Sequence, residues 1–115
     1  MTEHPRVMLD DVIHSPVRLS IIASLARIGE IDFAALREIV DVSDSLLSKH
    51  LRQLEECGYV RVRKGSVARR PRTWLCLTDD GSTAFRHYRA VLAEILDPGA
   101  PEPITPSEQA APQPS

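Results

Sequence analysis

Four polar side chains between residues 45 and 52 have the chemistry and spacing to hydrogen-bond to base edges or to phosphates. Ser45, Ser48, Lys49 and Arg52 share one face if this stretch is helical, and no acidic residue lies between Ser45 and Arg52. Serine can donate to or accept from a base, lysine favours the acceptors of guanine, and arginine one turn further on suits phosphate. A small, basic helical face of this kind can enter a DNA major groove. The alternative is an ordinary solvent-exposed helix.

The helix that must carry these residues has a recognisable start and end. Ser43 can accept a hydrogen bond from the free amides of the first turn, and Gly58 can supply the left-handed residue after the last turn. Leu47, Leu51 and Leu54 recur at spacings of four and three, which is one apolar stripe. We therefore expect buried leucines behind an exposed polar face, with Ser43 beside that face at the start of the helix.

The distribution of charge favours nucleic acid more than the total charge does. The chain of 115 residues has a formal net charge of −2. The stretch from Ser43 to Cys76 nevertheless holds eight basic residues against three acidic ones. Recognition of phosphate needs a local basic patch, so a slightly acidic protein is compatible with DNA binding.

Two shorter helices and a short strand are predicted before this helix. Ser15-Pro16 is a typical helix start, and the helix should end at Gly29. Glu30 to Asp32 has room only for a one-bridge strand, and Asp32 can cap a second helix. The apolar stripes expected on the two helices are Val17, Ile21, Ile22, Leu25 and Ile28, and then Phe33, Leu36, Ile39 and Val40.

A hairpin with a basic tip is predicted after Gly58. Val60 and Val62 alternate with arginines, which indicates a half-buried strand, and residues 73–77 form a second strand rich in β-branched and aromatic side chains. Residues 65–72 between them are predicted to be a loop. Its arginines suit a narrow minor groove or phosphates, and they are Arg69, Arg70 and Arg72.

A long helix over residues 79–96, capped by Thr78, is expected to join two copies of the chain. Its apolar residues are spaced three, four and three, as in a coiled-coil seam: Phe85, Tyr88, Leu92 and Ile95. A short helical turn over residues 8–13 could pack beside this seam through Leu9, Val12 and Ile13. The alternative is that the seam folds back onto the first long helix of the same chain.

This order of elements predicts a mainly α, α+β fold, namely a winged helix-turn-helix with a two-stranded wing and a long C-terminal helix. The sequence SDSLLSKHLRQLEECGYV resembles the recognition helix of ArsR-type regulators, and RPRTWLCLTDDGSTAF resembles the wing and following helix of MarR-type regulators, including Leu-Thr-x-x-Gly at Leu77, Thr78 and Gly81. The resemblance covers residues 8–96. We therefore expect a domain over 8–96, a flexible arm over 1–7, and a disordered proline-rich tail over 97–115.

The resemblance implies a transcriptional regulator, interpreted as a repressor. The apolar seam of the last helix predicts a homodimer, and two-fold pairing of the subunits predicts an inverted-repeat operator. Its recognition helix, about Ser43 to Cys57, would lie in the major groove, and its wing would contact the minor groove or backbone. Two alternatives stay open. One is a winged helix that binds another protein. The other is a regulator that responds to redox state, through Cys57 or Cys76, or to a small-molecule effector at the dimer interface.

Other kinds of site are not predicted. Metal sensors similar to this chain carry paired cysteines after the Gly-Glu that corresponds to Gly29-Glu30, where this sequence has Asp32 and Ala34 instead, so the soft ligands are missing. No nucleophile, phosphate-binding glycine loop or ligand cluster indicates an enzyme or a cofactor. Two cysteines do not form a disulfide framework, and no apolar run is long enough to span a membrane. We expect a cytoplasmic protein.

Overall fold

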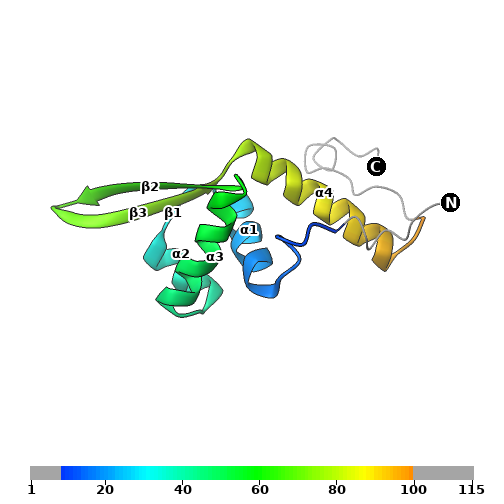
Figure 1. Ribbon diagram of the computed structural model, residues 1–115, viewed down its shortest axis with the longest axis horizontal. Helices are drawn as coiled ribbons and strands as arrows, with labels where there is room; N and C mark the ends of the chain where they lie inside the picture. The colour runs from blue at the N-terminus through cyan, green and yellow to red at the C-terminus, as the bar shows by residue number, and fades with distance from the viewer. Residues whose placement is uncertain (1–8, 100–115) are drawn as a thin grey trace, which may run out of the picture.

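The structure, a computed structural model, describes residues 9–99, and this part of the chain forms four helices and a small antiparallel sheet (Figure 1). The predicted arm over residues 1–7 and the tail beyond residue 99 lie outside the described residues. The predicted order of elements is confirmed, and so is the winged-helix fold class. The elements are α1 (Pro16–Ile28), β1 (Ile31–Asp32), α2 (Phe33–Val40), α3 (Asp44–Glu56), β2 (Val60–Val67), β3 (Arg70–Leu77) and α4 (Asp79–Leu96).

Each helix begins at the residue whose side chain was expected to cap it. Ser15 accepts from the amide of Arg18, and Asp32 and Ser43 accept from the amides of Ala35 and Leu46 in the same way. Thr78 accepts from the amide of Gly81 at 3.0 Å. These bonds satisfy amides that have no partner within the first turn of a helix. The starts of the helices are therefore determined locally.

The end of α3 is equally well defined. Gly58 has a φ of 83°, the left-handed conformation expected of it. The amide of Tyr59 donates to the carbonyl of Leu54 at 2.9 Å, and the amide of Gly58 donates to that of Glu55 at 3.0 Å. This pair of bonds is a Schellman motif, which satisfies the last carbonyls of the helix and turns the chain into β2.

The core lies where α1, α2 and α3 meet the base of the sheet. The predicted leucine stripe of α3 is buried. The buried apolar residues of this cluster are Ile21, Ile22, Leu25, Ile31, Leu36, Leu47, Leu51, Leu54, Val60 and Leu75. Two residues expected on the stripes lie outside it, because Ile28 and Ile39 are 43% and 45% exposed in the last turns of their short helices. Their inclusion in the stripes was wrong.

The sheet has the order β1-β3-β2, with both pairs antiparallel. The predicted short strand is confirmed as β1, although it makes two bridges where one was expected: Ile31 and Asp32 lie opposite Leu75 and Trp74. β2 and β3 are paired along their whole length and form a hairpin that extends well beyond the helices (Figure 1).

The prediction of a loop over residues 65–72 was wrong. Both strands continue to the tip, where only Ala68 and Arg69 remain in the turn, with φ of 51° and 66°. Positive φ at both central residues is the geometry of a type I′ turn, which suits the twist of a hairpin. Pro71 lies opposite Ser66, next to the hydrogen-bonded pair that closes the turn, where an antiparallel pair does not use its N–H groups. Proline is therefore tolerated here.

The start of α4 is packed against the start of β2. The hydroxyl of Thr78 donates to the carbonyl of Gly58 at 2.5 Å, and its amide donates to the carbonyl of Tyr59 at 3.0 Å. Gly81, one turn into the helix, is buried, and a Cβ at this position would lie 2.1 Å from the Tyr59 oxygen. The Leu-Thr-x-x-Gly sequence thus combines a helix cap with a close approach between two backbones.

The predicted seam of α4 is divided between the inside and the outside of the chain. α4 contacts α1 and then extends away from the hairpin, so that its end lies far from it (Figure 1). Tyr88 is only 2% exposed, and Phe85 packs against the core, so the first half of the seam contacts the chain's own body. Leu92 and Ile95 are half-buried, and Leu96 is 74% exposed.

Replacement of Gly81 by alanine should destabilise the fold strongly. The new methyl group would overlap the Tyr59 carbonyl, and backbone atoms cannot move aside as a flexible side chain would. We expect Gly81→Ala to lower the free energy of unfolding by about 2–3 kcal/mol in urea titrations. Ser82→Ala in the same turn is exposed and serves as the control, with an effect within about 0.5 kcal/mol. Equal stability of the two variants would contradict this packing.

Candidate nucleic-acid interface

The exposed face of α3 carries the polar residues that the sequence singled out. Ser45, Ser48, Lys49 and Arg52 are all exposed, on the side of the helix away from its buried leucines. The hydroxyl of Ser43 accepts the capping bond from Leu46 at 3.2 Å and lies 3.4 Å from that of Ser45. Either hydroxyl of this pair can be the donor. The face therefore offers hydroxyl groups near the helix start and two cations further along.

One exposed residue of this face was missed by the sequence reasoning. Leu46 in the first turn of α3 is 37% exposed, whereas the neighbouring Leu47 is fully buried. Its position gave the signal, because Leu46 lies outside the four-and-three spacing of the buried stripe. An exposed leucine here adds an apolar contact surface of the kind that meets the methyl group of thymine.

The start of α3 is held by α2 through an ion pair. Arg37 Nη1 lies 2.7 Å from Asp44 Oδ1, and Arg37 Nη2 lies 3.2 Å from Glu38 Oε1. The hydrogen bond to Asp44 is the main reason that the pKa of Arg37 is raised above its usual value. Asp44 is the one acidic residue in the first turn of α3, and the guanidinium of Arg37 offsets the repulsion that its carboxylate would exert on a phosphate.

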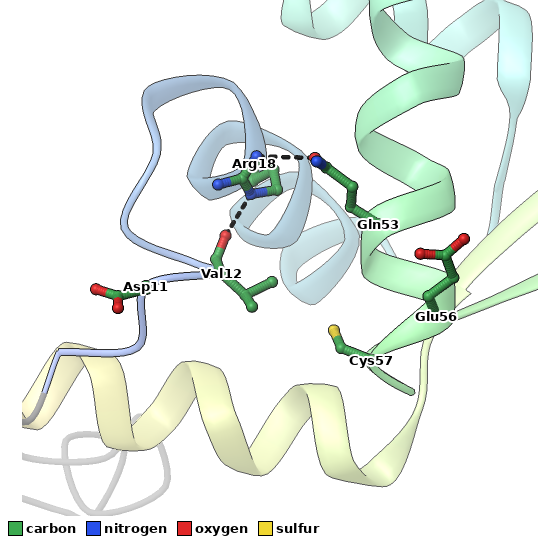
Figure 2. Close-up of a pocket in the computed structure, with 6 residues that line it drawn as sticks. All are labelled: Asp11, Val12, Arg18, Gln53, Glu56 and Cys57. Carbon is green, nitrogen blue, oxygen red and sulfur yellow. Dashed lines mark hydrogen bonds between the residues drawn. The ribbon is translucent and has the colours of Figure 1, made fainter.

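The C-terminal half of α3 is held by α1 through Arg18. Its Nη1 lies 2.9 Å from Gln53 Oε1, and its Nε donates to the Val12 carbonyl at 2.5 Å (Figure 2). The same Nη1 lies 3.1 Å from His50 Nδ1. A guanidinium has only donors, so the His50 Nδ1 that faces it must be an unprotonated acceptor. Burial, and then the charge of Arg18, lowers the pKa of His50 below its usual value. These contacts give His50 a role within the protein.

The hairpin separates the three arginines that the sequence placed together at its tip. Arg69 lies in the turn, and Arg70 begins β3 beside it, so these two share the tip. Arg72 is instead drawn toward the helices, 3.5 Å from the Asp32 carboxylate and 5.8 Å from the ring of Trp74. Arg63 stacks on the same ring at 5.4 Å and pairs with Glu30 at 3.0 Å.

A cavity of about 400 Å³ lies between the segment before α1 and the end of α3 (Figure 2). It is lined by Asp11, Val12, Arg18, Gln53, Glu56 and Cys57. Burial raises the pKa of the Cys57 thiol, which donates to the Leu54 carbonyl at 3.3 Å. A raised pKa disfavours the thiolate, which is the reactive form of cysteine. Within residues 9–99, no group of three His, Cys, Asp or Glu side chains could hold a metal ion.

The family to which the chain belongs follows from comparison with known proteins. The model of the winged helix DNA-binding domain matches residues 17–96, from α1 to the end of α4. The chain belongs to this family. This winged-helix domain is also 35% identical, over 85 residues, to an uncharacterized protein of Methanocaldococcus jannaschii, covering 74% of this chain and 89% of that protein.

Solved structures with the same fold include transcriptional regulators. A transcriptional regulator homologue from Pyrococcus horikoshii OT3 has a TM-score of 0.73 and 29% identity, covering 80% of this chain and 91% of that one. NadR, in complex with 4-hydroxyphenylacetate, has a TM-score of 0.65 and 28% identity, covering 81% of this chain and 65% of that one. A regulator of the MarR family from Enterococcus faecalis V583 has a TM-score of 0.64 at 22% identity, covering 70% and 73%. The expected likeness to MarR-type regulators is confirmed for the fold.

The winged-helix domain therefore has the fold of DNA-binding transcriptional regulators, which are not enzymes. None of the helices in residues 9–99 has the length and apolar character needed to cross a membrane.

The depressed pKa of His50 predicts that the domain loses stability in mild acid. The unfolded chain takes up a proton at His50 near pH 6.5, while the folded protein resists it until a lower pH. The free energy of unfolding should therefore decrease as pH falls through about 6.5 toward the folded-state pKa, and be insensitive to His50 above that range. Urea titrations of wild type and His50→Gln between pH 5 and 8 isolate this effect, because glutamine accepts a hydrogen bond without titrating. Parallel profiles for the two proteins would contradict it.

Proposed function

We propose that this protein is a sequence-specific transcriptional repressor in which α3 enters the major groove of DNA. One observation carries the proposal. The exposed face of α3 consists of small hydroxyl groups and cations over a buried leucine stripe, and the one acid of its first turn is paired with Arg37. Repression by occupying an operator requires only DNA binding, which is the activity that this surface supports.

The residues of α3 have different roles in this proposal. Ser43, Ser45, Ser48 and Lys49 lie in the first two turns, the part of a docked recognition helix that meets base edges. Arg52 lies one turn further on, where it suits the phosphate backbone. The hydroxyl groups and Lys49 would therefore set base preference, and Arg52 would add affinity.

The tip of the hairpin would contact the minor groove or the backbone. Its length carries Arg69 and Arg70 well beyond the helices (Figure 1). Arginine is suited to both targets because a narrow minor groove concentrates negative potential. Arg72 contributes less directly in this proposal, since it is paired with Asp32.

A homodimer joined through the second half of α4 would double this small interface. Leu92, Ile95 and the highly exposed Leu96 leave an apolar end on the helix, and Leu9 and Val12 are half-buried. Tyr88 is already buried within the chain, so a partner could cover little more of it. Two-fold pairing leads to an operator of inverted half-sites about 34–36 Å apart.

Control by a small molecule is a second candidate function, and the cavity beside Arg18 is the observation that favours it. NadR, which has a similar fold, was solved with 4-hydroxyphenylacetate bound. A cavity at the end of α3 would let a ligand alter the groove-facing helix. The raised pKa of Cys57 weighs against a thiol switch as the signal. A winged helix that binds another protein is the remaining alternative, and it would show no preference among DNA duplexes.

Selection of duplexes from a random pool tests the proposal, followed by binding at two salt concentrations. A DNA-binding regulator should enrich an inverted repeat. Lys49→Ala should then reduce discrimination between the selected and altered base pairs by about 1–3 kcal/mol. Arg69→Ala should weaken binding to all duplexes and make the salt dependence less steep, by about 0.9 in the log–log slope for each phosphate that the variant no longer neutralises.

Arg27→Ala is the matched control, because Arg27 is an exposed arginine at the end of α1, outside α3 and the hairpin. It removes one positive charge but should leave base preference unchanged. If Arg69→Ala binds with full affinity at both low and high salt, the tip of the hairpin does not contact DNA.

The dimer proposal predicts that charge on the outer half of α4 separates the subunits. The double variant Leu92→Glu with Ile95→Glu should be folded by circular dichroism, monomeric by light scattering, and weak in binding the inverted repeat. Ala90→Glu is the control, since Ala90 is an exposed residue of the same helix outside the seam. A wild-type protein that is monomeric at micromolar concentration and still binds the repeat tightly as one copy would contradict the dimer.

A further inference from the structure

Arg18 connects two parts of the chain that are distant in sequence. It lies in the first turn of α1, and its side chain reaches the carbonyl of Val12 on one side and Gln53 of α3 on the other (Figure 2). The same side chain also contacts His50 of α3. Three of its N–H groups, one on Nε and two on Nη1, have partners within the protein. The planar guanidinium holds these partners in one fixed arrangement, which a flexible ammonium group would not do.

The segment on the far side of Arg18 is itself fixed to the body of the protein. The hydroxyl of Tyr59 donates to the Asp10 carboxylate at 2.5 Å, and that bond is the main reason that the pKa of Tyr59 is raised to about 12. The other oxygen of Asp10 accepts from the amide of Val12 at 2.8 Å. His14 Nδ1 lies 2.9 Å from the hydroxyl of Tyr88 on α4. Arg18 thus joins α3 to a segment whose position is set by Tyr59, in the turn between α3 and β2, and by α4.

The leucines of α3 cannot supply the same constraint. Apolar burial is non-directional, so it holds the helix against the core but tolerates a small rotation or slide along it. Hydrogen bonds lose strength steeply when their angle changes. His50 directly follows Lys49, and Gln53 lies about one turn further along α3. Bonds at these two residues therefore restrain the orientation of the half of α3 that would face DNA.

We propose that Arg18 is a positioning residue for base recognition, which holds α3 at the angle set by residues 10–14 and α4 without touching DNA itself. This inference rests on the proposed function. In this proposal Arg18 increases the discrimination between correct and altered base pairs, while Arg52 and the tip of the hairpin contact the phosphates. Loss of the guanidinium should leave α3 folded but loosely oriented, so that correct and altered base pairs are bound more equally.

Arg18→Lys is the informative variant, because it keeps the positive charge but loses the planar guanidinium and its fixed set of N–H donors. Arg27→Lys makes the same change at an exposed position of the same helix. Binding is measured to the duplex selected by wild type and to copies with one altered base pair, at several salt concentrations. We expect Arg18→Lys to lose about tenfold in discrimination with an unchanged salt slope, and Arg27→Lys to match wild type in both.

The pH dependence of discrimination provides a second readout that a purely structural role would not change. A protonated His50 cannot accept from Arg18, and the charges that face it are those of Arg18 on α1 and of Lys49 on its own helix. Wild-type discrimination should therefore decrease between pH 7.5 and 5.5. In His50→Gln, whose amide oxygen can accept at every pH, the same profile should be flat.

Three results would overturn the inference, and one of them concerns the proposed function. A salt slope shallower by about one in Arg18→Gln, which removes the positive charge, would make Arg18 a phosphate contact. A lower melting temperature with unchanged discrimination would leave Arg18 with a structural role only. Failure of the wild-type protein itself to prefer any duplex would refute DNA recognition, and with it this role of Arg18, before any variant is compared.

Discussion

Burial of one stripe of leucines on α3 is the constraint on which the rest of the structure depends. Leu47, Leu51 and Leu54 pack into the core formed with α1, α2 and the sheet. A helix of this length has one buried side, so the choice of buried residues also decides which side is exposed. Because the leucines are buried, the opposite side of the helix, with the serines, Lys49 and Arg52, is exposed to solvent. The caps at Ser43 and Gly58 fix where this two-sided helix begins and ends.

Three acidic residues near the basic surface are paired with arginines, so their negative charges repel DNA less. Asp44 is paired with Arg37, Glu30 with Arg63, and Asp32 with Arg72. All three pairs are at least partly exposed, and pairs of this kind contribute only about 0–1 kcal/mol to stability. Their main consequence is electrostatic. They reduce repulsion beside α3 and the base of the hairpin, and they leave the arginines of the tip as the exposed cations farthest from the helices.

Polar contacts, rather than apolar ones, link the parts of the chain that surround α3. Thr78 ties the start of α4 to the end of α3 and the start of β2, and Gly81 allows the two backbones to approach. Tyr59 and Tyr88 hold the segment before α1, and Arg18 extends this set of contacts to α3. Such bonds are directional, so they specify angles between elements that share a non-directional core.

The sequence alone determined the helices and the exposed polar residues of α3, because caps, stop signals and apolar spacing act within one or two turns. The extent of the hairpin was decided only by the tertiary structure. Gly65 and Pro71 are local signals for a loop, but cross-strand pairing of residues 65–67 with 70–72 overrides them, and no Asn-Gly marks the turn at Ala68 and Arg69. The same holds for Tyr88, which is buried with its hydroxyl beside His14, and for Arg18 and Arg72, whose partners lie far away in sequence. A side chain's partner in a folded protein depends on packing between elements, and spacing along one element carries no information about it.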